Sequence, residues 1–240
     1  MFIIFTCIIK IDSIIKMKYI NQLKSIISNT SSIIGKDKYI NSAVLVPIIV
    51  IKGIEYLLFE KRSQSVRQPG EVSFPGGHFD VSQDVDYLST AIRETCEELG
   101  ISENKISIIG KLGTLVAPMG VIVEAYLGTL NINSFSELEI DKQEVENVFI
   151  IPLDFFIDNK PAEYFTRLEL YPYITNEIGE REELLPVKEL GLPDIYSLPW
   201  KNNKHRVLVY RTNDEIIWGI TAELTFELSN KLKEQIEKKI

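Results

Sequence analysis

The chain has 240 residues and a formal net charge of −8, with 45% hydrophobic and 25% charged residues. This composition is typical of a globular protein that buries a core, and the negative charge disfavours nonspecific nucleic-acid binding. The two cysteines, Cys7 and Cys96, form neither a disulfide framework nor a zinc pattern, so we expect a reducing, intracellular compartment.

Residues 1–40 differ in charge from the rest of the chain. They carry a net charge of +4, and residues 41–240 carry −12. Apolar residues from Ile8 to Ile27 recur partly at helical spacing. No apolar stretch reaches the ~20 residues of a membrane span, and no secretory signal is clear. We therefore expect an N-terminal extension, with a targeting helix, a docking helix or a start at Met17 left open.

The first elements predicted after this extension are strands. The apolar run "SAVLVPIIVI" (42–51) and the segment "IEYLLFEKR" (54–62) flank a turn at Lys52–Gly53, a pattern typical of a strand pair. Residues 63–85 are rich in turn formers. Further strands are predicted at 106–116 and 121–130.

The second half of the chain alternates irregularly between strand and helix patterns. A strand and a short helix are expected over "VENVFIIPLDFFID", followed by a loop-rich region at 160–205. A hairpin around Thr212–Asp214 and an amphipathic helix from Thr221 end the chain. This order predicts an α/β (α+β) fold in which helices sandwich a mixed β-sheet, with residues 41–240 as one domain.

The segment between residues 84 and 100 is predicted to be a helix. Asp84 or Asp86 can cap its start, and Gly100 can end it. We expect Cys96 to be a small residue of the inward face rather than a nucleophile. The apolar face of this helix is predicted to contain Leu88, Ala91, Ile92, Cys96 and Leu99.

Three glutamates of this helix, Glu94, Glu97 and Glu98, lie within a wedge of about 100°. Arg93 can pair with Glu97 one turn on. The remaining negative charge can bind a hard divalent cation, although a solvated acidic face is a common alternative. The preceding "SFPGGHFD" supplies glycines whose carbonyls can join a cation site and whose amides can meet a phosphate.

These residues resemble the signature of the Nudix hydrolases, in which a glycine and a glutamate precede Arg-Glu-apolar-x-Glu-Glu-x-Gly-apolar. Gly77 and "RETCEELGI" (93–101) match, except for Thr95 at the apolar position. The segment from Gly77 to Arg93 is two residues longer than usual. Val85 stands where the first glutamate is expected, and either Asp84 or Asp86 can substitute for it or the loop can bulge.

A narrower resemblance links the chain to the coenzyme A pyrophosphatases of this family. The segment "LLFEKRSQSVRQPGEVSFPGGHFD" (57–80) is similar to the motif that precedes their Nudix signature, although Val66 and Gln68 depart from it. Segments 117–128, 144–158 and 217–224 also resemble that subfamily. The resemblance covers about residues 42–228.

The resemblance implies a Nudix fold and hydrolysis of coenzyme A or a derivative to 4′-phosphopantetheine and adenosine 3′,5′-bisphosphate. It implies Mg²⁺ or Mn²⁺, bound by Glu94, Glu97, Glu98 and the Gly77 carbonyl, which would neutralise the pyrophosphate and acidify the attacking water. Arg93 would hold the glutamates in register. Glu97 and Glu144 are alternative general bases, with a solvated loop carboxylate as the other interpretation of Glu144.

The implied substrate contacts come from Arg62 and Arg67, which could hold its anionic ends, and from the amides at Gly76 and Gly77. Surface arginines that pair only locally are the alternative. His78 and His205 are expected to be polar loop or edge residues, since an oxygen-rich Mg²⁺ site does not need imidazole. Trp200 and Trp218 could stack on adenine, but core packing is favoured for both.

Two other functions remain open at this stage. One is a Nudix enzyme that cleaves ADP-ribose, a dinucleoside polyphosphate or NADH, and the other is a noncatalytic Nudix-like nucleotide-binding module. The partners expected are a small molecule, either coenzyme A or acyl-CoA, and a second copy of the chain in a homodimer. Cytoplasm, mitochondrion and peroxisome are not distinguished by the sequence.

Overall fold

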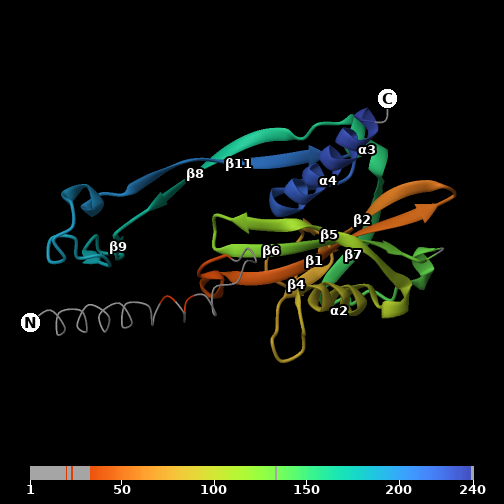
Figure 1. Cartoon of the computed structure of the whole chain (residues 1–240), viewed down its shortest axis with the longest axis horizontal. Helices are drawn as coiled ribbons and strands as arrows, with labels where there is room; N and C mark the ends of the chain where they lie inside the picture. The colour runs from red at the N-terminus through yellow and green to blue at the C-terminus, as the bar shows by residue number, and fades with distance from the viewer. Residues whose placement is uncertain (1–19, 21–22, 24–32, 133, 239–240) are drawn as a thin grey trace, which may run out of the picture. The chain divides into compact units, whose positions relative to one another are not determined.

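The computed structural model describes residues 20, 23, 33–132 and 134–238, with residues 201–203 described by their backbone alone. The chain divides into two compact units, residues 1–36 and 37–240 (Figure 1). The helical spacing expected over residues 8–27 falls outside the described residues, apart from Ile20 and Leu23. Among the helices that are described, none has the length and apolar character needed to span a bilayer.

One mixed sheet organises the described part of residues 37–240. Its strands are β1 (Ile40–Ile51), β2 (Ile54–Arg62), β3 (Val72–Ser73), β4 (Gly76–His78), β5 (Ile106–Ala117), β6 (Val121–Leu130) and β7 (Val145–Pro152). The strand order is β3-β2-β1-β6-β5, with β4 paired to β1 and β7 to β2. Strands β1 and β6 are parallel and the other pairs are antiparallel, so the predicted mixed sheet is confirmed.

The predicted turn between β1 and β2 is confirmed. Lys52 and Gly53 have positive φ angles of 51° and 79°, and Ile51 pairs with Ile54. Two positive φ angles suit the hairpin turns whose twist matches that of the flanking strands. The hairpin thereby directs the far end of β2 toward β3 and β7, with which it also pairs.

Helix α2 (Tyr87–Leu99) begins and ends near the predicted residues. The Asp86 carboxylate accepts from the Ser89 amide at 2.8 Å, and the Asp86 amide donates to the Ser89 hydroxyl at 3.0 Å. This reciprocal pair satisfies amides that have no partner within the helix. Gly100 adopts the left-handed conformation, with φ 62°, and ends the helix. Asp86 is therefore the cap, and Asp84 is free for another role.

The predicted inward face of α2 is wrong for several residues. The buried residues of this helix are Thr90, Ala91, Thr95, Glu98 and Leu99. Leu88, Ile92 and Cys96 are only half-buried and line a surface cavity of 630 Å³. The helix is rotated relative to its apolar pattern because Glu98, a polar residue, points toward the sheet, where the Gly76 amide donates to it. Burial raises the pKa of the Cys96 thiol, which disfavours the nucleophilic thiolate.

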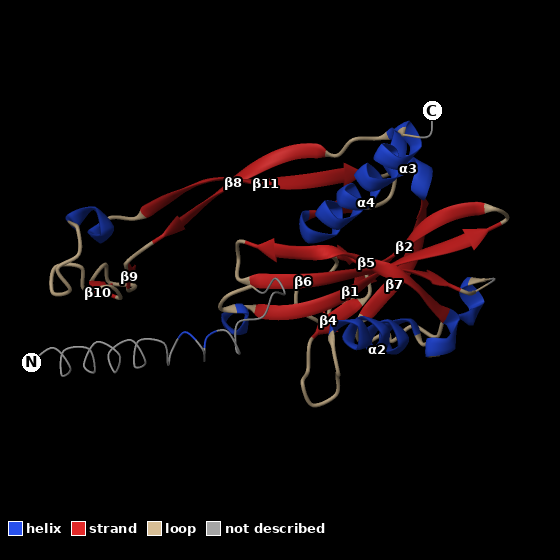
Figure 2. Cartoon of the chain, in the orientation of Figure 1, coloured by secondary structure: helices blue, strands red, loops and turns tan. Residues whose placement is uncertain are grey.

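Helices cover both faces of the sheet, as predicted. Figure 2 shows α2 on one side and α3 (Leu153–Asp158) with α4 (Gly219–Glu237) on the other. The alternation of β-strand side chains sends Leu58 into the cluster beneath α2 and Leu57 into the cluster beneath α4. The part of the chain that the structure describes also contains four short 3₁₀ helices: η1 (Lys36–Lys38), η2 (Glu103–Lys105), η3 (Phe135–Glu137) and η4 (Asp194–Ser197).

The loop-rich region expected at residues 160–205 is partly wrong, because much of it is strand. Three strands form a second sheet in the order β12-β11-β8: β8 (Ala162–Leu170), β11 (Trp200–Arg211) and β12 (Ile216–Trp218). A separate hairpin pairs β9 (Tyr173–Thr175) with β10 (Arg181–Glu183). The five prolines that suggested loops all lie outside these strands, and Pro161, Pro172 and Pro199 lie beside strand ends rather than within a strand. The predicted hairpin around residues 212–214 is confirmed as β11–β12.

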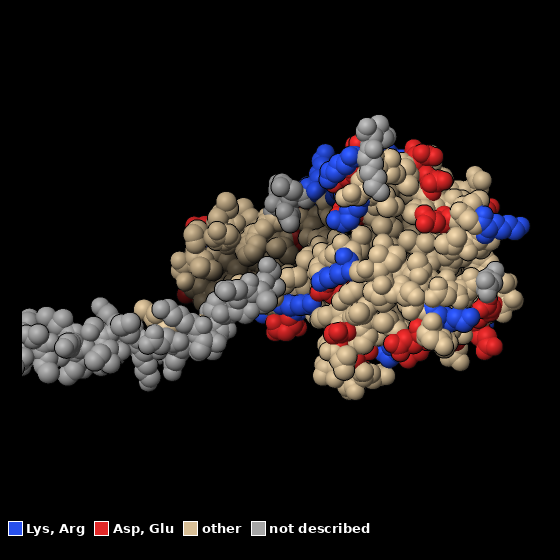
Figure 3. Space-filling view, turned by 45° about the vertical axis from the view of Figure 1, so that its right-hand side comes forward, with Lys and Arg blue, Asp and Glu red and all other residues tan. Residues whose placement is uncertain are grey.

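Charged side chains of both signs share the face of the molecule shown in Figure 3. There, lysines and arginines lie among aspartates and glutamates rather than in one block. On this face the two signs are therefore mixed, although the chain as a whole carries a net charge of −8.

Candidate active site

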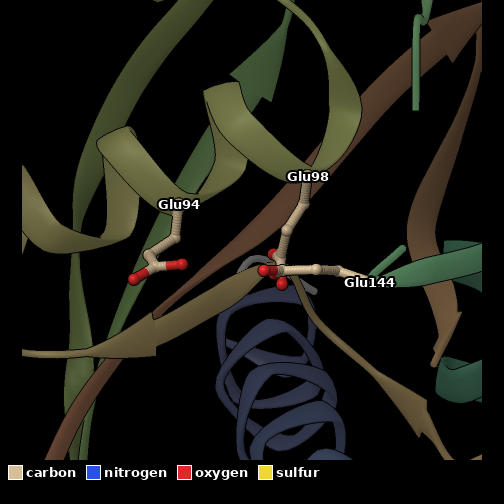
Figure 4. A group of neighbouring side chains, drawn as sticks. All are labelled: Glu94, Glu98 and Glu144. Atoms are coloured by element: carbon tan, nitrogen blue, oxygen red, sulfur yellow. The ribbon is translucent and has the colours of Figure 1, made fainter. Parts of the chain in front are cut away.

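Three glutamates from two elements converge at the end of the sheet. Glu94 and Glu98 lie one turn apart on α2, and Glu144 lies in the loop before β7. One carboxylate oxygen from each lies within 4.8 Å of the others. Figure 4 shows the Glu98 and Glu144 carboxylates pointing toward one another, with Glu94 beside them. The group combines a buried residue, Glu98, with the exposed Glu144, so it opens toward solvent.

The loop that carries Glu144 is fastened to the end of β2. The Ser63 amide donates to the Glu144 carbonyl at 2.8 Å, and the Ser63 hydroxyl donates to the Gln143 carbonyl. The Glu144 amide donates to the Asp141 carbonyl at 3.1 Å. These backbone contacts place the Glu144 side chain opposite α2, although 80 residues or more of chain separate Ser63 from this loop.

Gly76 and Gly77, which sequence reasoning assigned to the site, lie directly against the glutamates. The Gly76 amide donates to Oε2 of Glu98 at 2.8 Å. A Cβ atom at Gly77 would lie 2.3 Å from the Glu94 carboxylate, closer than any side chain could approach. At Gly76 a Cβ atom would lie 2.3 Å from the Ala43 carbonyl of β1. Gly76 is therefore needed for the close approach of β4 to β1, and Gly77 leaves room for the Glu94 carboxylate of α2.

Arg93 connects Asp84, Glu94 and Glu97 at the outer side of the cluster. Its Nε donates to Oδ1 of Asp84 at 2.9 Å and its Nη2 donates to Oδ2 at 3.1 Å. It also forms ion pairs of 2.9 Å with Glu94 and with Glu97. Glu97 itself is exposed and does not join the three converging glutamates. Arg93 thus holds Glu94 in place, as expected, while Glu97 lies on the solvent side of this ion pair.

Asp84 is a site residue whose role the sequence left open. Its side chain is buried and accepts from the Asp80 amide at 3.0 Å and the Thr90 hydroxyl at 2.9 Å. The hydrogen bonds from Arg93 lower the pKa of Asp84 to about 2. Val85, which stands where the signature expects a glutamate, is 91% exposed. The longer loop therefore turns Val85 outward and presents Asp84 to Arg93.

Sequence reasoning missed Glu60, a fully buried glutamate of β2. It is directly opposite Ser73 of β3, whose hydroxyl donates to its Oε1 at 2.9 Å. Its carboxyl lies within hydrogen-bonding reach of that of Glu98. The alternation of side chains along a strand was a signal in the sequence, because it places Glu60 on the same face of β2 as Leu58. In the structure this face is the one that packs beneath α2.

The buried carboxylates of this site have raised pKa values. Burial raises the pKa of Glu60 to about 7, and burial together with Glu60 raises the pKa of Glu98 to about 10. Burial also raises the pKa of Glu94. Each shift shows that a buried carboxylate lacks sufficient counter-charge here. A cluster of carboxylates with this deficit fits a divalent cation of the Mg²⁺ or Mn²⁺ type, which prefers oxygen ligands.

The two candidate substrate arginines lie differently. Arg62, at the end of β2, is half-buried, and its Nε donates to the Arg67 carbonyl at 3.0 Å. Arg62 forms no ion pair within 4.0 Å with any residue that the structure describes. It lines a cavity of 180 Å³ with Ser73, Met119 and Trp218. Arg67 is exposed. The two arginines contact each other locally, but through the Arg67 backbone carbonyl and not through the Arg67 side chain.

Of the remaining aromatic and histidine candidates, both tryptophans and His78 are exposed, and His205 in β11 is half-buried. The favoured core packing of Trp200 and Trp218 is wrong, since they are 40% and 44% exposed. Trp218 lines the cavity beside Arg62, and the Trp200 indole donates to the Tyr196 carbonyl at 3.4 Å. His78 lies in β4 with its Nδ1 3.2 Å from the Ser42 hydroxyl, which fits the expected polar edge residue.

Comparison with known proteins agrees with this geometry. The NUDIX domain family matches residues 41–168. The chain is 33% identical to "Nudix hydrolase 3" of Caenorhabditis elegans over 93% of its own length and 87% of that protein. It is 34% identical to the mouse "Peroxisomal coenzyme A diphosphatase NUDT7" over 60% of this chain and 58% of that protein.

A second relative of this kind is the human "Mitochondrial coenzyme A diphosphatase NUDT8", 34% identical over 52% of this chain and 53% of that protein. The match thus spans little more than half the length of either coenzyme A diphosphatase. The family match covers more than half of the chain and contains Gly77, α2 and Glu144. The chain therefore belongs to the Nudix family of hydrolases.

Proposed function

We propose that this chain hydrolyses the pyrophosphate bond of coenzyme A or a derivative, giving 4′-phosphopantetheine and adenosine 3′,5′-bisphosphate. The observation that supports hydrolysis is the convergence of Glu94, Glu98 and Glu144 within 4.8 Å. The substrate class is supported by the segment 57–80 and by the relatives described as coenzyme A diphosphatases. An intracellular location fits this substrate, and the names of those relatives point to the peroxisome and the mitochondrion.

The ligands proposed for Mg²⁺ or Mn²⁺ are the carboxylates of Glu94 and Glu98 and the Gly77 carbonyl. Glu144 lies beside these ligands. A bound cation would neutralise charge on the pyrophosphate and acidify a water molecule for attack. Glu97 contributes indirectly in this arrangement, because its ion pair with Arg93 occupies one side of the guanidinium. Arg93 then keeps Glu94 oriented through its Nη2, while Asp84 fixes Arg93.

Glu144 is the general base that the geometry favours over Glu97. It is exposed, so water and substrate can reach it, and its carboxylate faces Glu98. Glu97 is held in an ion pair with Arg93 and lies outside the three converging glutamates. A base must lie within hydrogen-bond reach of the proton that it removes, and Glu144 stands at the solvent side of the cluster.

The anionic and aromatic parts of the substrate are assigned to the cavity beside β2. Ser73 connects this cavity to the glutamate cluster, since it lines the cavity and donates to Glu60. Arg62 supplies a positive charge there, and Trp218 supplies an aromatic face at its rim. A phosphate of the substrate could contact Arg62 while adenine stacks on Trp218. Arg67 contacts Arg62 through its carbonyl, so its side chain could contact a second anionic group of the substrate.

The decisive experiment is product identification by mass spectrometry. Coenzyme A, an acyl derivative and ADP-ribose are incubated in parallel with the protein and Mg²⁺ or Mn²⁺. Adenosine 3′,5′-bisphosphate and a 4′-phosphopantetheine product are expected from the first two. Glu98→Gln is the control for contaminating activity. Cleavage of ADP-ribose with no product from either coenzyme A substrate would overturn the subfamily assignment, and cleavage of none would favour a binding module.

A further inference from the structure

Glu60 is placed beside the glutamate cluster by the pairing of β2 with β3. Its register opposite Ser73 and its position two residues after Leu58 turn its side chain to the α2 side of the sheet. The residue is 1% exposed. A glutamate is almost never buried to this extent without a partner that compensates its charge. A cation, or a proton shared with Glu98, is therefore needed to offset the charge of Glu60.

The hydrogen bonds within the described residues offset only half of this carboxylate. Oε1 accepts from the Ser73 hydroxyl, but Oε2 is buried with no hydrogen-bond partner in the described part of the chain. Among the described residues, the neighbouring Glu98 accepts one amide, that of Gly76, at its Oε2. Both carboxylates attract the charge of Arg62, yet neither forms an ion pair with it. Two adjoining carboxylates thus share too few donors.

We propose that Glu60 is a fourth carboxylate of the metal site and binds a divalent cation together with Glu98. Its Oε2 is buried without a hydrogen-bond partner among the described residues, and its carboxyl lies within hydrogen-bonding reach of that of Glu98, on the side of the cluster toward the sheet. A cation between these carboxylates would supply the missing charge and the missing contact at once. Glu98 would then lie between Glu94 and Glu144 on its solvent side and Glu60 on the side toward the sheet. The inference rests on the proposed metal site but not on the identity of the substrate.

Binding of Mn²⁺ to metal-stripped protein, measured by calorimetry and by the electron paramagnetic resonance of free Mn²⁺, tests this. Glu60→Gln is the principal variant, because glutamine can still accept from Ser73 and can donate to Glu98. We expect it to bind one fewer Mn²⁺, or to bind one at least ~10-fold more weakly, the scale of losing a group that supports a metal site. An isotherm that superimposes on that of the wild type would overturn the proposal.

The controls separate this proposal from the metal site itself. Glu71→Gln makes the same chemical change at a half-buried glutamate that also lies near Arg62, and it should bind Mn²⁺ as the wild type does. Glu98→Gln should weaken Mn²⁺ binding. If Glu98→Gln binds Mn²⁺ as the wild type does, the proposed metal site is wrong. If Glu98→Gln weakens Mn²⁺ binding and Glu60→Gln does not, the metal site stands and only the role of Glu60 is wrong.

A folding control is built into the same series. Circular dichroism and thermal unfolding of the metal-free proteins establish whether Glu60→Gln is folded. Should it not fold, Glu60→Asp keeps the charge but withdraws the carboxylate by one methylene group. We expect weaker Mn²⁺ binding for that variant also, and wild-type binding by it would contradict a ligand at this position.

Discussion

Asp84 and Arg93 form a two-point ion pair across the start of α2, with Nε and Nη2 of the arginine 2.9 and 3.1 Å from the two carboxylate oxygens. The Asp84 side chain is 1% exposed and that of Arg93 is 22% exposed. Because Arg93 also contacts Glu94, the pair links the longer loop to a proposed metal ligand. The loop that departs from the family signature thereby has a structural role.

Asp84→Asn should destabilise the protein by about 2 kcal/mol, because it removes charge from a buried partner of Arg93. The pKa of Asp84 lies near 2, below its ordinary value of 3.8. A lowered pKa adds stability above pH 3.8 that is lost as the pH falls toward 2. The difference in unfolding free energy between wild type and variant should therefore shrink below about pH 4.

Urea titrations at pH 6, 4 and 3 measure this difference. The control is Asp86→Asn, since asparagine is nearly as good a helix cap as aspartate and Asp86 lies outside the ion pair. We expect that variant to stay within about 0.5 kcal/mol of the wild type at pH 6. A difference for Asp84→Asn that does not change with pH would show that its charge is not the cause.

Gly77→Ala should impair metal binding while leaving the fold almost intact. The added Cβ would lie 2.3 Å from the Glu94 carboxylate, which is the end of a flexible side chain and can move aside. A small displacement of the Glu94 carboxylate is enough to disturb the site, because metal binding depends on the positions of the ligands. We expect at least ~10-fold weaker Mn²⁺ binding and a change in unfolding free energy below about 1 kcal/mol.

Gly110→Ala is the matched control for Gly77→Ala. Gly110 lies in β5, where an added Cβ meets no atom within 4 Å. Both variants replace a strand glycine by alanine, so they share any effect on the unfolded chain. Wild-type Mn²⁺ binding by Gly77→Ala would show that Glu94 is not a ligand or that it tolerates the shift.

Local patterns were enough to predict the framework of the site. An apolar run and a second strand-like segment on either side of a turn identified the β1–β2 hairpin, and the cap residues with Gly100 bounded α2. The glutamates of α2 followed from helical geometry and from the resemblance to a known signature. These features depend on residues close together in the chain, which is why sequence reasoning reached them.

Features that depend on distant contacts were not predictable in the same way. Glu60 faces Glu98 only because β2, β3 and α2 pack together, and a strand pattern alone cannot identify that neighbour. The face of α2 was misassigned because buried polar residues replace apolar ones where the helix meets the site. Strand β8 was hidden by flanking prolines that end strands rather than exclude them.

Glu98→Gln should lower the rate of pyrophosphate cleavage by at least ~100-fold, the scale of a lost electrostatic stabiliser. Glutamine keeps the size of the side chain and can still accept from the Gly76 amide, so the protein should remain folded. Glu97→Gln gives the contrast on the same helix, because Glu97 is exposed and outside the converging group. We expect a loss for it of less than ~10-fold, arising from the altered ion pair with Arg93.

Steady-state kinetics and circular dichroism of the two variants are the measurements. Near wild-type turnover by Glu98→Gln would refute the assignment of Glu98 as a metal ligand. A loss for Glu97→Gln as large as that for Glu98→Gln would return Glu97 to the catalytic centre, as the sequence alone suggested.

Glu144→Gln should reduce kcat by ~100-fold or more and leave KM within a few-fold of the wild type, as expected for a general base rather than a binding group. Its loop is fixed by backbone contacts to Ser63 and Asp141, which the substitution leaves in place. Glu146→Gln is the matched control, since Glu146 is also exposed two residues on but is not part of the converging group.

The dependence of the kinetics on pH and on Mn²⁺ distinguishes a general base from a metal ligand. Loss of a base removes the acidic limb of the kcat profile, whereas loss of a metal ligand raises the Mn²⁺ concentration needed for half-maximal activity. An unchanged profile in Glu144→Gln with a raised Mn²⁺ requirement would assign Glu144 to the metal site alone.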